Sequence, residues 1–93
     1  MIYAIEFTDI ALAHIEKLKY SGNIAVTKKI RRLLEELTEH PETGTGKPEK
    51  LKYDYNGYWS RRINREHRLV YFIDKELITV TVISAYGHYD SGI

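Results

Sequence analysis

Residues 47–68 read KPEKLKYDYNGYWSRRINREHR. The Asn56-Gly57 pair in their middle is a strong signal for a type I′ hairpin turn, with strands predicted over 51–55 and 58–63. The segment holds seven basic and three acidic residues, a net charge of +4, and four aromatic rings are interleaved with them. Because the whole chain carries only +1, the other residues sum to −3. Local positive charge mixed with aromatic faces is typical of a surface that binds nucleic acid.

The chain remains β-rich downstream of this segment. After a polar turn at 64–67, residues 68–73 read RLVYFI, a nearly continuous apolar run that indicates a central strand. Residues 74–76 form another predicted turn. Residues 77–85 then alternate apolar side chains with Thr and Ser, as a strand with one covered face does.

Upstream of the segment the pattern is mainly helical. A short strand is predicted over 1–7, and a first helix follows the N-cap types Thr8 and Asp9 and runs to about residue 20. After a break at Ser21-Gly22-Asn23, a second helix is predicted over 24–39. Its buried face follows from the spacing of Val26, Ile30, Leu33, Leu34 and Leu37.

The predicted order is therefore β-α-α-β-β-β-β, an α+β fold in a single domain covering residues 1–93. The simplest architecture is a two-helix hairpin packed on one face of an antiparallel sheet. The other face would be open, and the basic hairpin would belong to that face or to its rim.

Composition narrows the function classes. The chain has no cysteine, which excludes disulfides and thiolate metal sites. No apolar run approaches the roughly 20 residues of a membrane span, so we expect no membrane association and a cytoplasmic location. The four histidines lack metal-ligand spacing, and Gly44-Thr45-Gly46-Lys47 is followed by a proline and a strand, where a phosphate-binding loop needs a helix. We expect neither a metal nor another cofactor.

The residues suit RNA cleavage without a metal. Internal transesterification needs a base for the 2′-hydroxyl, cations for the charged phosphorane and an acid for the leaving 5′-oxygen. Glu49 is the candidate base, Arg68 the candidate charge stabiliser, and His88 the candidate acid. Tyr89 could stack on a base or assist proton transfer. The candidate phosphate and RNA contacts are Lys47, Lys52, Trp59, Arg61, Arg62 and Arg65.

Each of these assignments has a plainer alternative. Glu49 between lysines can be a surface ion pair, and His88 can be an exposed residue without a role. Arg61 and Arg62 can be a solvated pair on alternating sides of a strand, since neighbouring strand residues face opposite ways. Trp59 suits the core as well as it suits RNA.

The motifs GxGKPExLK and NGYWSRRINxEHRLVY, with a late His-Tyr pair, resemble the Txe/YoeB family of bacterial toxins within the RelE/ParE superfamily. The matching residues are Gly44, Gly46, Lys47, Pro48, Glu49, Leu51, Lys52, Asn56, Gly57, Tyr58, Trp59, Ser60, Arg61, Arg62, Ile63, Glu66, His67, Arg68, Leu69, Val70, Tyr71, His88 and Tyr89. The strong part of the resemblance covers about half of the chain.

The resemblance implies a RelE-like fold and a ribosome-dependent mRNA interferase that cuts the messenger in the ribosomal A site. The family's catalytic residues fall on Glu49, Arg68, His88 and Tyr89, and its supporting basic residues on Lys52 and Arg62. A YefM-like antitoxin with an acidic C-terminal segment is the implied partner, and a homodimer is a form that an isolated toxin of this family can take.

Two other functions stay open at this point. One is a protein of the same fold that blocks its target without chemistry, as the ParE branch does with DNA gyrase. The other is a plain RNA-binding module. Only the interferase needs the set Glu49, Arg68, His88 and Tyr89.

Overall fold

The computed structural model describes residues 2–52 and 57–87; residues 1, 53–56 and 88–93 lie outside the described part. In chain order the elements are β1 (Ala4–Phe7), α1 (Asp9–Tyr20), α2 (Ile24–Glu39), β2 (Glu49–Lys50), β3 (Tyr58–Arg62), β4 (Arg68–Asp74) and β5 (Thr79–Ser84). The predicted order β-α-α-β-β-β-β is confirmed. No helix in the described ranges has the length and apolar character that crossing a membrane requires.

The two helices begin and end where their capping residues predict. The Thr8 hydroxyl accepts a hydrogen bond from the Ala11 amide, and the Asn23 side chain accepts one from the Val26 amide. Each cap satisfies one of the amides that lack a partner in a first helical turn. The reversal between the helices passes through Gly22, whose φ of 81° suits a residue without a Cβ.

The sheet is mixed, which corrects one part of the predicted architecture. Its strand order is β1-β5-β4-β3-β2. The pairs among β2 to β5 are antiparallel, but β1 runs parallel to β5, with Ile5 opposite Val80. An antiparallel arrangement was the natural expectation for strands joined by hairpins. No hairpin joins β1 to β5, since the helices and three strands separate them in the chain.

The hairpin at β2 and β3 also differs from the prediction. The strand predicted over 51–55 is replaced by Glu49–Lys50, with Lys50 opposite Trp59. The Leu51 amide donates to the Tyr58 carbonyl at 2.9 Å. In a hairpin with a two-residue turn at 56–57, the amide of residue 55 would donate to that carbonyl instead. The connection is therefore longer than a type I′ turn, and Asn56 itself lies outside the described residues.

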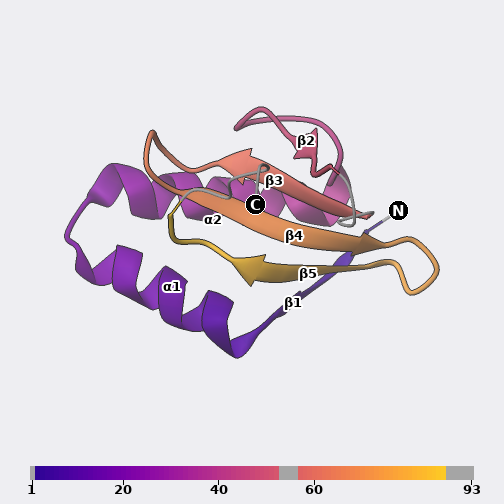
Figure 1. Ribbon diagram of the computed structural model, residues 1–93, viewed down its shortest axis with the longest axis horizontal. Helices are drawn as coiled ribbons and strands as arrows, with labels where there is room; N and C mark the ends of the chain where they lie inside the picture. The colour runs from indigo at the N-terminus through magenta and orange to yellow at the C-terminus, as the bar shows by residue number, and fades with distance from the viewer. Residues whose placement is uncertain (1, 53–56, 88–93) are drawn as a thin grey trace.

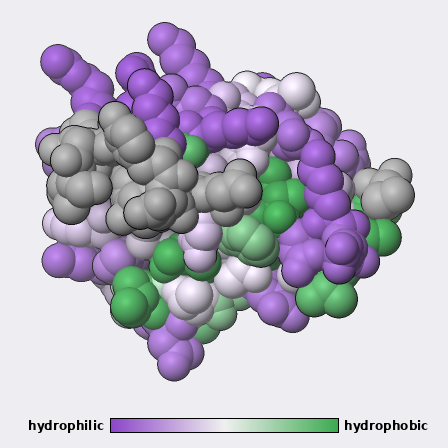
Figure 2. Space-filling model, turned by 45° about the vertical axis from the view of Figure 1, so that its right-hand side comes forward, coloured by the Kyte–Doolittle hydropathy of each residue, from purple (hydrophilic) through white to green (hydrophobic). Residues whose placement is uncertain are grey.

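The two faces of the sheet have different coverings. The helix-facing side chains form the core together with α1 and α2, and include Leu69, Tyr71, Val80 and Val82, all fully buried. In Figure 1 the strands β3 and β4 lie in front of α2, so the viewer sees the face that the helices leave uncovered. Figure 2 shows that hydrophilic side chains gather along the upper part of the molecule, where β2 and β3 lie in Figure 1.

A β-bulge interrupts the pairing of β4 with β5. Tyr71 is opposite Val82 but Val70 is opposite Ser84, so Ile83 is an extra residue on β5. The extra residue reverses the alternation. As a result Ala85, three residues after Val82, is again fully buried in the core.

Candidate active site

The candidate base and the candidate phosphate ligand form an ion pair. Glu49 lies opposite Ser60 in the β2–β3 ladder, and Arg68 lies opposite Arg62 in the β3–β4 ladder, which puts all four on the face away from the helices. Arg68 Nη1 donates to Glu49 Oε1 at 3.0 Å and lies 3.5 Å from Ser60 Oγ. The Glu49 side chain is 62% exposed and that of Arg68 is 17% exposed.

This pair contributes little to stability, because exposed ion pairs are worth roughly 0–1 kcal/mol. Its geometry suits binding. Among the guanidinium nitrogens of Arg68, only Nη1 has a hydrogen-bond partner within the described ranges, so no described residue occupies Nε or Nη2. An arginine fork matches two oxygens of a phosphate.

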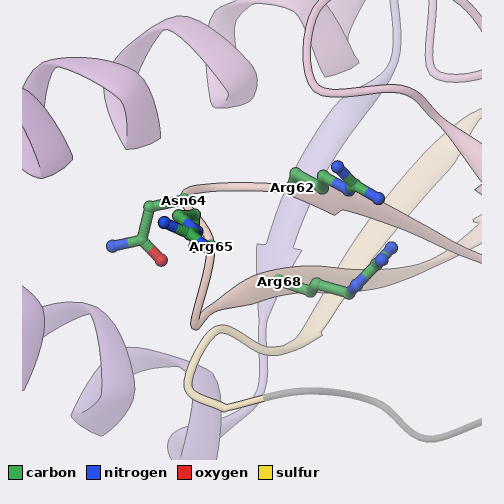
Figure 3. Close-up of a pocket in the computed structure, with 4 residues that line it drawn as sticks. All are labelled: Arg62, Asn64, Arg65 and Arg68. Atoms are coloured by element: carbon green, nitrogen blue, oxygen red, sulfur yellow. The ribbon is translucent and has the colours of Figure 1, made fainter.

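A hollow of about 180 Å³ adjoins the pair. It is lined by Arg62, Asn64, Arg65 and Arg68. Figure 3 shows Arg62 and Arg68 extending in the same direction from neighbouring strands, with Arg65 and Asn64 at the turn between those strands. Arg62 and Arg65 form no ion pair within the described part of the chain. Three guanidinium groups around one hollow make a strong local attraction for a polyanion.

Arg61 lies on the opposite face, and the prediction that it contacts RNA is wrong. Its side chain is fully buried. Nε donates to the Tyr71 hydroxyl, Nη1 to the Glu36 carboxylate and the Thr45 carbonyl, and Nη2 to the carbonyls of His40 and Thr43. These partners use all five N–H donors of the guanidinium. Alternation along β3 is the physical reason, since neighbours on a strand face opposite sides.

The carboxylate that balances Arg61 is strongly acidic. Burial alone would raise the pKa of Glu36, but hydrogen bonds from the Thr45 hydroxyl and amide, from Arg61 and from Arg32 outweigh it and lower the pKa from 4.5 to about 2. Burial raises the pKa of Tyr71, so that its hydroxyl stays protonated and donates to the Pro41 carbonyl at 2.7 Å.

Together these contacts fix the loop that leads to Glu49. Its inner side is tied down by Arg61 and Tyr71 at residues 40, 41, 43 and 45. On its outer side the Arg62 amide donates to the Gly46 carbonyl at 2.7 Å. A Cβ on Gly46 would come within 2.8 Å of the Arg62 carbonyl oxygen, so only glycine fits there. The buried arginine thus helps to place the candidate base on the other face.

The chain after β5 passes next to Arg68. The Arg68 amide donates to the Gly87 carbonyl at 3.1 Å, and the Gly87 amide donates to His67 Nδ1 at 2.8 Å. His14 Nδ1 accepts from the Ala85 amide at 3.1 Å. No role was predicted for His14 or His67. Their neighbours in the sequence could not reveal one, because their partners lie 71 and 20 residues away.

The remaining predicted residues divide as follows. Lys47, Lys52, Arg62 and Arg65 are exposed. Trp59 is partly buried and packs against the core, as its plainer alternative held. His88 and Tyr89 lie outside the described residues. Gly87, which directly precedes His88, is held beside Arg68 by a hydrogen bond from the Arg68 amide.

Comparisons with known proteins identify the family. The family profile described as "YoeB-like toxin of bacterial type II toxin-antitoxin system" matches residues 7–89. This chain belongs to that family. It is a toxin of the YoeB type.

Individual relatives extend the comparison. The toxin YoeB of Streptomyces coelicolor is 49% identical over 65 residues, which cover 69% of this chain and 74% of the relative. The solved YoeB/ParE toxin from Agrobacterium tumefaciens is 35% identical, with a TM-score of 0.84. The match covers 92% of this chain and 99% of that chain. YoeB of Staphylococcus aureus has been solved as a dimer, with 37% identity to this chain and a TM-score of 0.81. It has also been solved in complex with YefM, with 38% identity and a TM-score of 0.77. Both matches cover 96% of this chain and 100% of the solved chain.

Proposed function

We propose that this toxin is a ribosome-dependent mRNA endoribonuclease that halts translation by cutting the messenger in the ribosomal A site. The observation that carries the proposal is the Glu49–Arg68 pair on the open face, at the border of a hollow lined by three arginines. A toxin that only blocked a target would need neither a carboxylate held against an arginine nor spare guanidinium donors beside it.

The proposed reaction is an internal transesterification. The Glu49 carboxylate takes the proton of the 2′-hydroxyl, whose oxygen attacks the neighbouring phosphorus. The bond between phosphorus and the 5′-oxygen breaks, and His88 gives that oxygen a proton. The products are a 2′,3′-cyclic phosphate and a 5′-hydroxyl end, so atoms and protons balance.

The cations act on the phosphorane. Arg68, Arg62 and Lys52 stabilise the charge that develops on its oxygens, and Arg65 and Lys47 hold the flanking backbone. When a phosphate draws the Arg68 guanidinium toward itself, the Glu49 carboxylate is released from its ion pair and is free to approach the 2′-hydroxyl. Tyr89 is proposed to stack on a nucleotide or to assist proton transfer.

The ribosome supplies the orientation of the substrate. The described part of the site holds charge-stabilising groups and one carboxylate but no deep cleft around a nucleotide, so the messenger must be positioned by something else. We place the action in the cytoplasm, where ribosomes are found.

Two protein partners are part of the proposal. A YefM-like antitoxin binds the arginine-lined face through an acidic segment, since that face suits an acidic peptide as well as RNA. The S. aureus relative was solved with YefM and as a dimer, which supports an antitoxin and a second copy of this chain as partners.

The test uses purified protein, ribosomes programmed with a defined mRNA, and matched mRNA whose A-site codon carries 2′-deoxyribose. We expect cleavage within the A-site codon, a cyclic phosphate and a 5′-hydroxyl at the new ends, and no cleavage of the deoxy substrate or of naked RNA. Cutting of the deoxy substrate would rule out the transesterification. Inhibition of translation without any new ends would rule out the nuclease.

A further inference from the structure

The three residues that follow β5 are held by two histidines from other elements. His14 of α1 accepts from the Ala85 amide, and His67, just before β4, accepts from the Gly87 amide. Between these contacts the Tyr86 ring lies 4.4 Å from the His67 ring, centroid to centroid, with Lys17 Nζ 4.2 Å from its centroid. In Figure 3 this segment turns beside the start of β4, close to Arg68.

Gly87 has both of its main-chain groups bound by consecutive residues. Its amide donates to the His67 side chain and its carbonyl accepts from the Arg68 amide. Its φ of 81° lies in the left-handed region that glycine adopts without strain. The position and orientation of Gly87 are therefore set by His67, Arg68 and this backbone angle.

The hydrogen bond specifies one form of His67. A ring nitrogen that accepts from an amide carries no proton, so the proton of the neutral ring lies on Nε2. The Glu66 carboxylate lies 3.7 Å from Nε2, on the side that favours this tautomer. The His67 side chain is 11% exposed, which shields the bond to Gly87 from competition by water.

We propose that His67 is a positioning residue for the reaction. Its Nδ1 fixes the Gly87 amide and thereby sets where the next residue, the candidate acid His88, begins relative to Arg68. This inference rests on the proposed function. It assigns to His67 a role through the main chain of Gly87, without contact to the substrate.

The plainer reading is that His67 only fills space against Tyr86. Two substitutions separate the readings. His67→Phe keeps a ring of similar size against Tyr86 but removes the acceptor. His67→Asn removes the ring but keeps an acceptor, because the Asn side-chain oxygen is attached to Cγ as Nδ1 is in His.

The experiment measures single-turnover cleavage of ribosome-bound mRNA over a range of protein concentrations, which separates the rate at saturation from the apparent affinity. NMR of the same proteins records hydrogen exchange of the Gly87 amide and the ¹⁵N shifts of the His67 ring. We expect His67→Phe to cleave roughly 10–100-fold more slowly at saturation, with little change in affinity, and to lose protection of the Gly87 amide. His67→Asn should recover most of both.

Three results would count against this account. A Phe variant as fast as the parent overturns the positioning role alone, as does an Asn variant no faster than the Phe variant. A parent that does not cut ribosome-bound mRNA overturns the proposed function and the inference with it. The NMR measurement distinguishes these cases, because the bond from Gly87 to His67 is observed without any activity.

Discussion

Two arginine–carboxylate pairs of the described residues, Arg61–Glu36 and Arg68–Glu49, lie on opposite faces of one sheet, and they differ in almost every respect but length. Arg61 and Glu36 lie 2.8 Å apart with side chains 0% and 16% exposed. Arg68 and Glu49 lie 3.0 Å apart with side chains 17% and 62% exposed. The first arginine uses every donor on protein groups, whereas Nε and Nη2 of the second have no partner among the described residues. Burial and donor use, more than distance, therefore separate a structural pair from a functional one.

The first and largest effect tests the structural pair. Arg61→Met should lower the free energy of unfolding by about 3–5 kcal/mol, because it removes a charged partner of the Glu36 carboxylate and the donors to the carbonyls of His40, Thr43 and Thr45. Arg62→Met, one residue along the same strand, should change it by less than about 0.5 kcal/mol. Urea denaturation followed by circular dichroism measures both. Equal losses of unfolding free energy in the two variants would contradict the placement of Arg61 in the interior and of Arg62 at the surface.

The acidity of Glu36 gives a second test of the buried pair. Its pKa is lowered from 4.5 to about 2 in the folded protein, so its contribution to stability is present above pH 4.5 and is lost as the pH falls toward 2. The loss in this window should be on the order of 2 kcal/mol. Glu36→Gln should be less stable at neutral pH and should lose less over the window. Unfolding curves recorded at several pH values for both proteins give the comparison.

Two glycines allow a matched test of the segment beside Arg68. Gly87 and Gly22 share a φ of 81°, and a Cβ on either would meet no atom of the described residues within 4 Å. A valine at either position should therefore cost a similar amount, about 1–2 kcal/mol, through backbone strain alone. Only Gly87→Val should also slow cleavage, and Gly87→Asn should be milder because Asn tolerates this backbone region. Equal cleavage by both valine variants would disconnect the segment from the site.

The smallest effect concerns the rim of the hollow. Arg65→Ala should weaken binding to programmed ribosomes only a few-fold and reduce the slope of log affinity against log salt by roughly one. The unfolding free energy should stay the same, because Arg65 is exposed and has no ion pair among the described residues. A salt titration of binding is sufficient. An unchanged slope would place Arg65 outside the contact with the RNA backbone.

Local patterns predicted much of the fold. The caps at Thr8 and Asn23 and the buried stripe of α2 act over a few residues, so the sequence displays them directly. The parallel pairing of β1 with β5 joins residues about 75 positions apart, and no local pattern reports it. The bulge at Ile83 could not be read from the sequence of β5 either, because a bulge is defined by the pairing with the partner strand, β4.

The candidate site was predicted less evenly. Glu49 and Arg68 were candidates from the chemistry of RNA cleavage, the family resemblance implied the same two residues, and the structure adds that they touch. Arg61 was misjudged because charge suggested a surface, whereas the strand alternation that places it inside was already visible in the sequence. The contact of His67 was not predicted because its partner is a backbone amide, and every residue except proline has one, so the sequence does not indicate which amide is bound.

The central claim is that the pair on the open face performs chemistry and does not stabilise the fold. The most direct measurement is the single-turnover rate of cleavage of ribosome-bound mRNA by Glu49→Gln and Arg68→Gln, with urea denaturation of the same proteins. We expect rates about 10²–10³-fold below the parent and losses of unfolding free energy below about 1 kcal/mol. Either variant cleaving at the rate of the parent would contradict it.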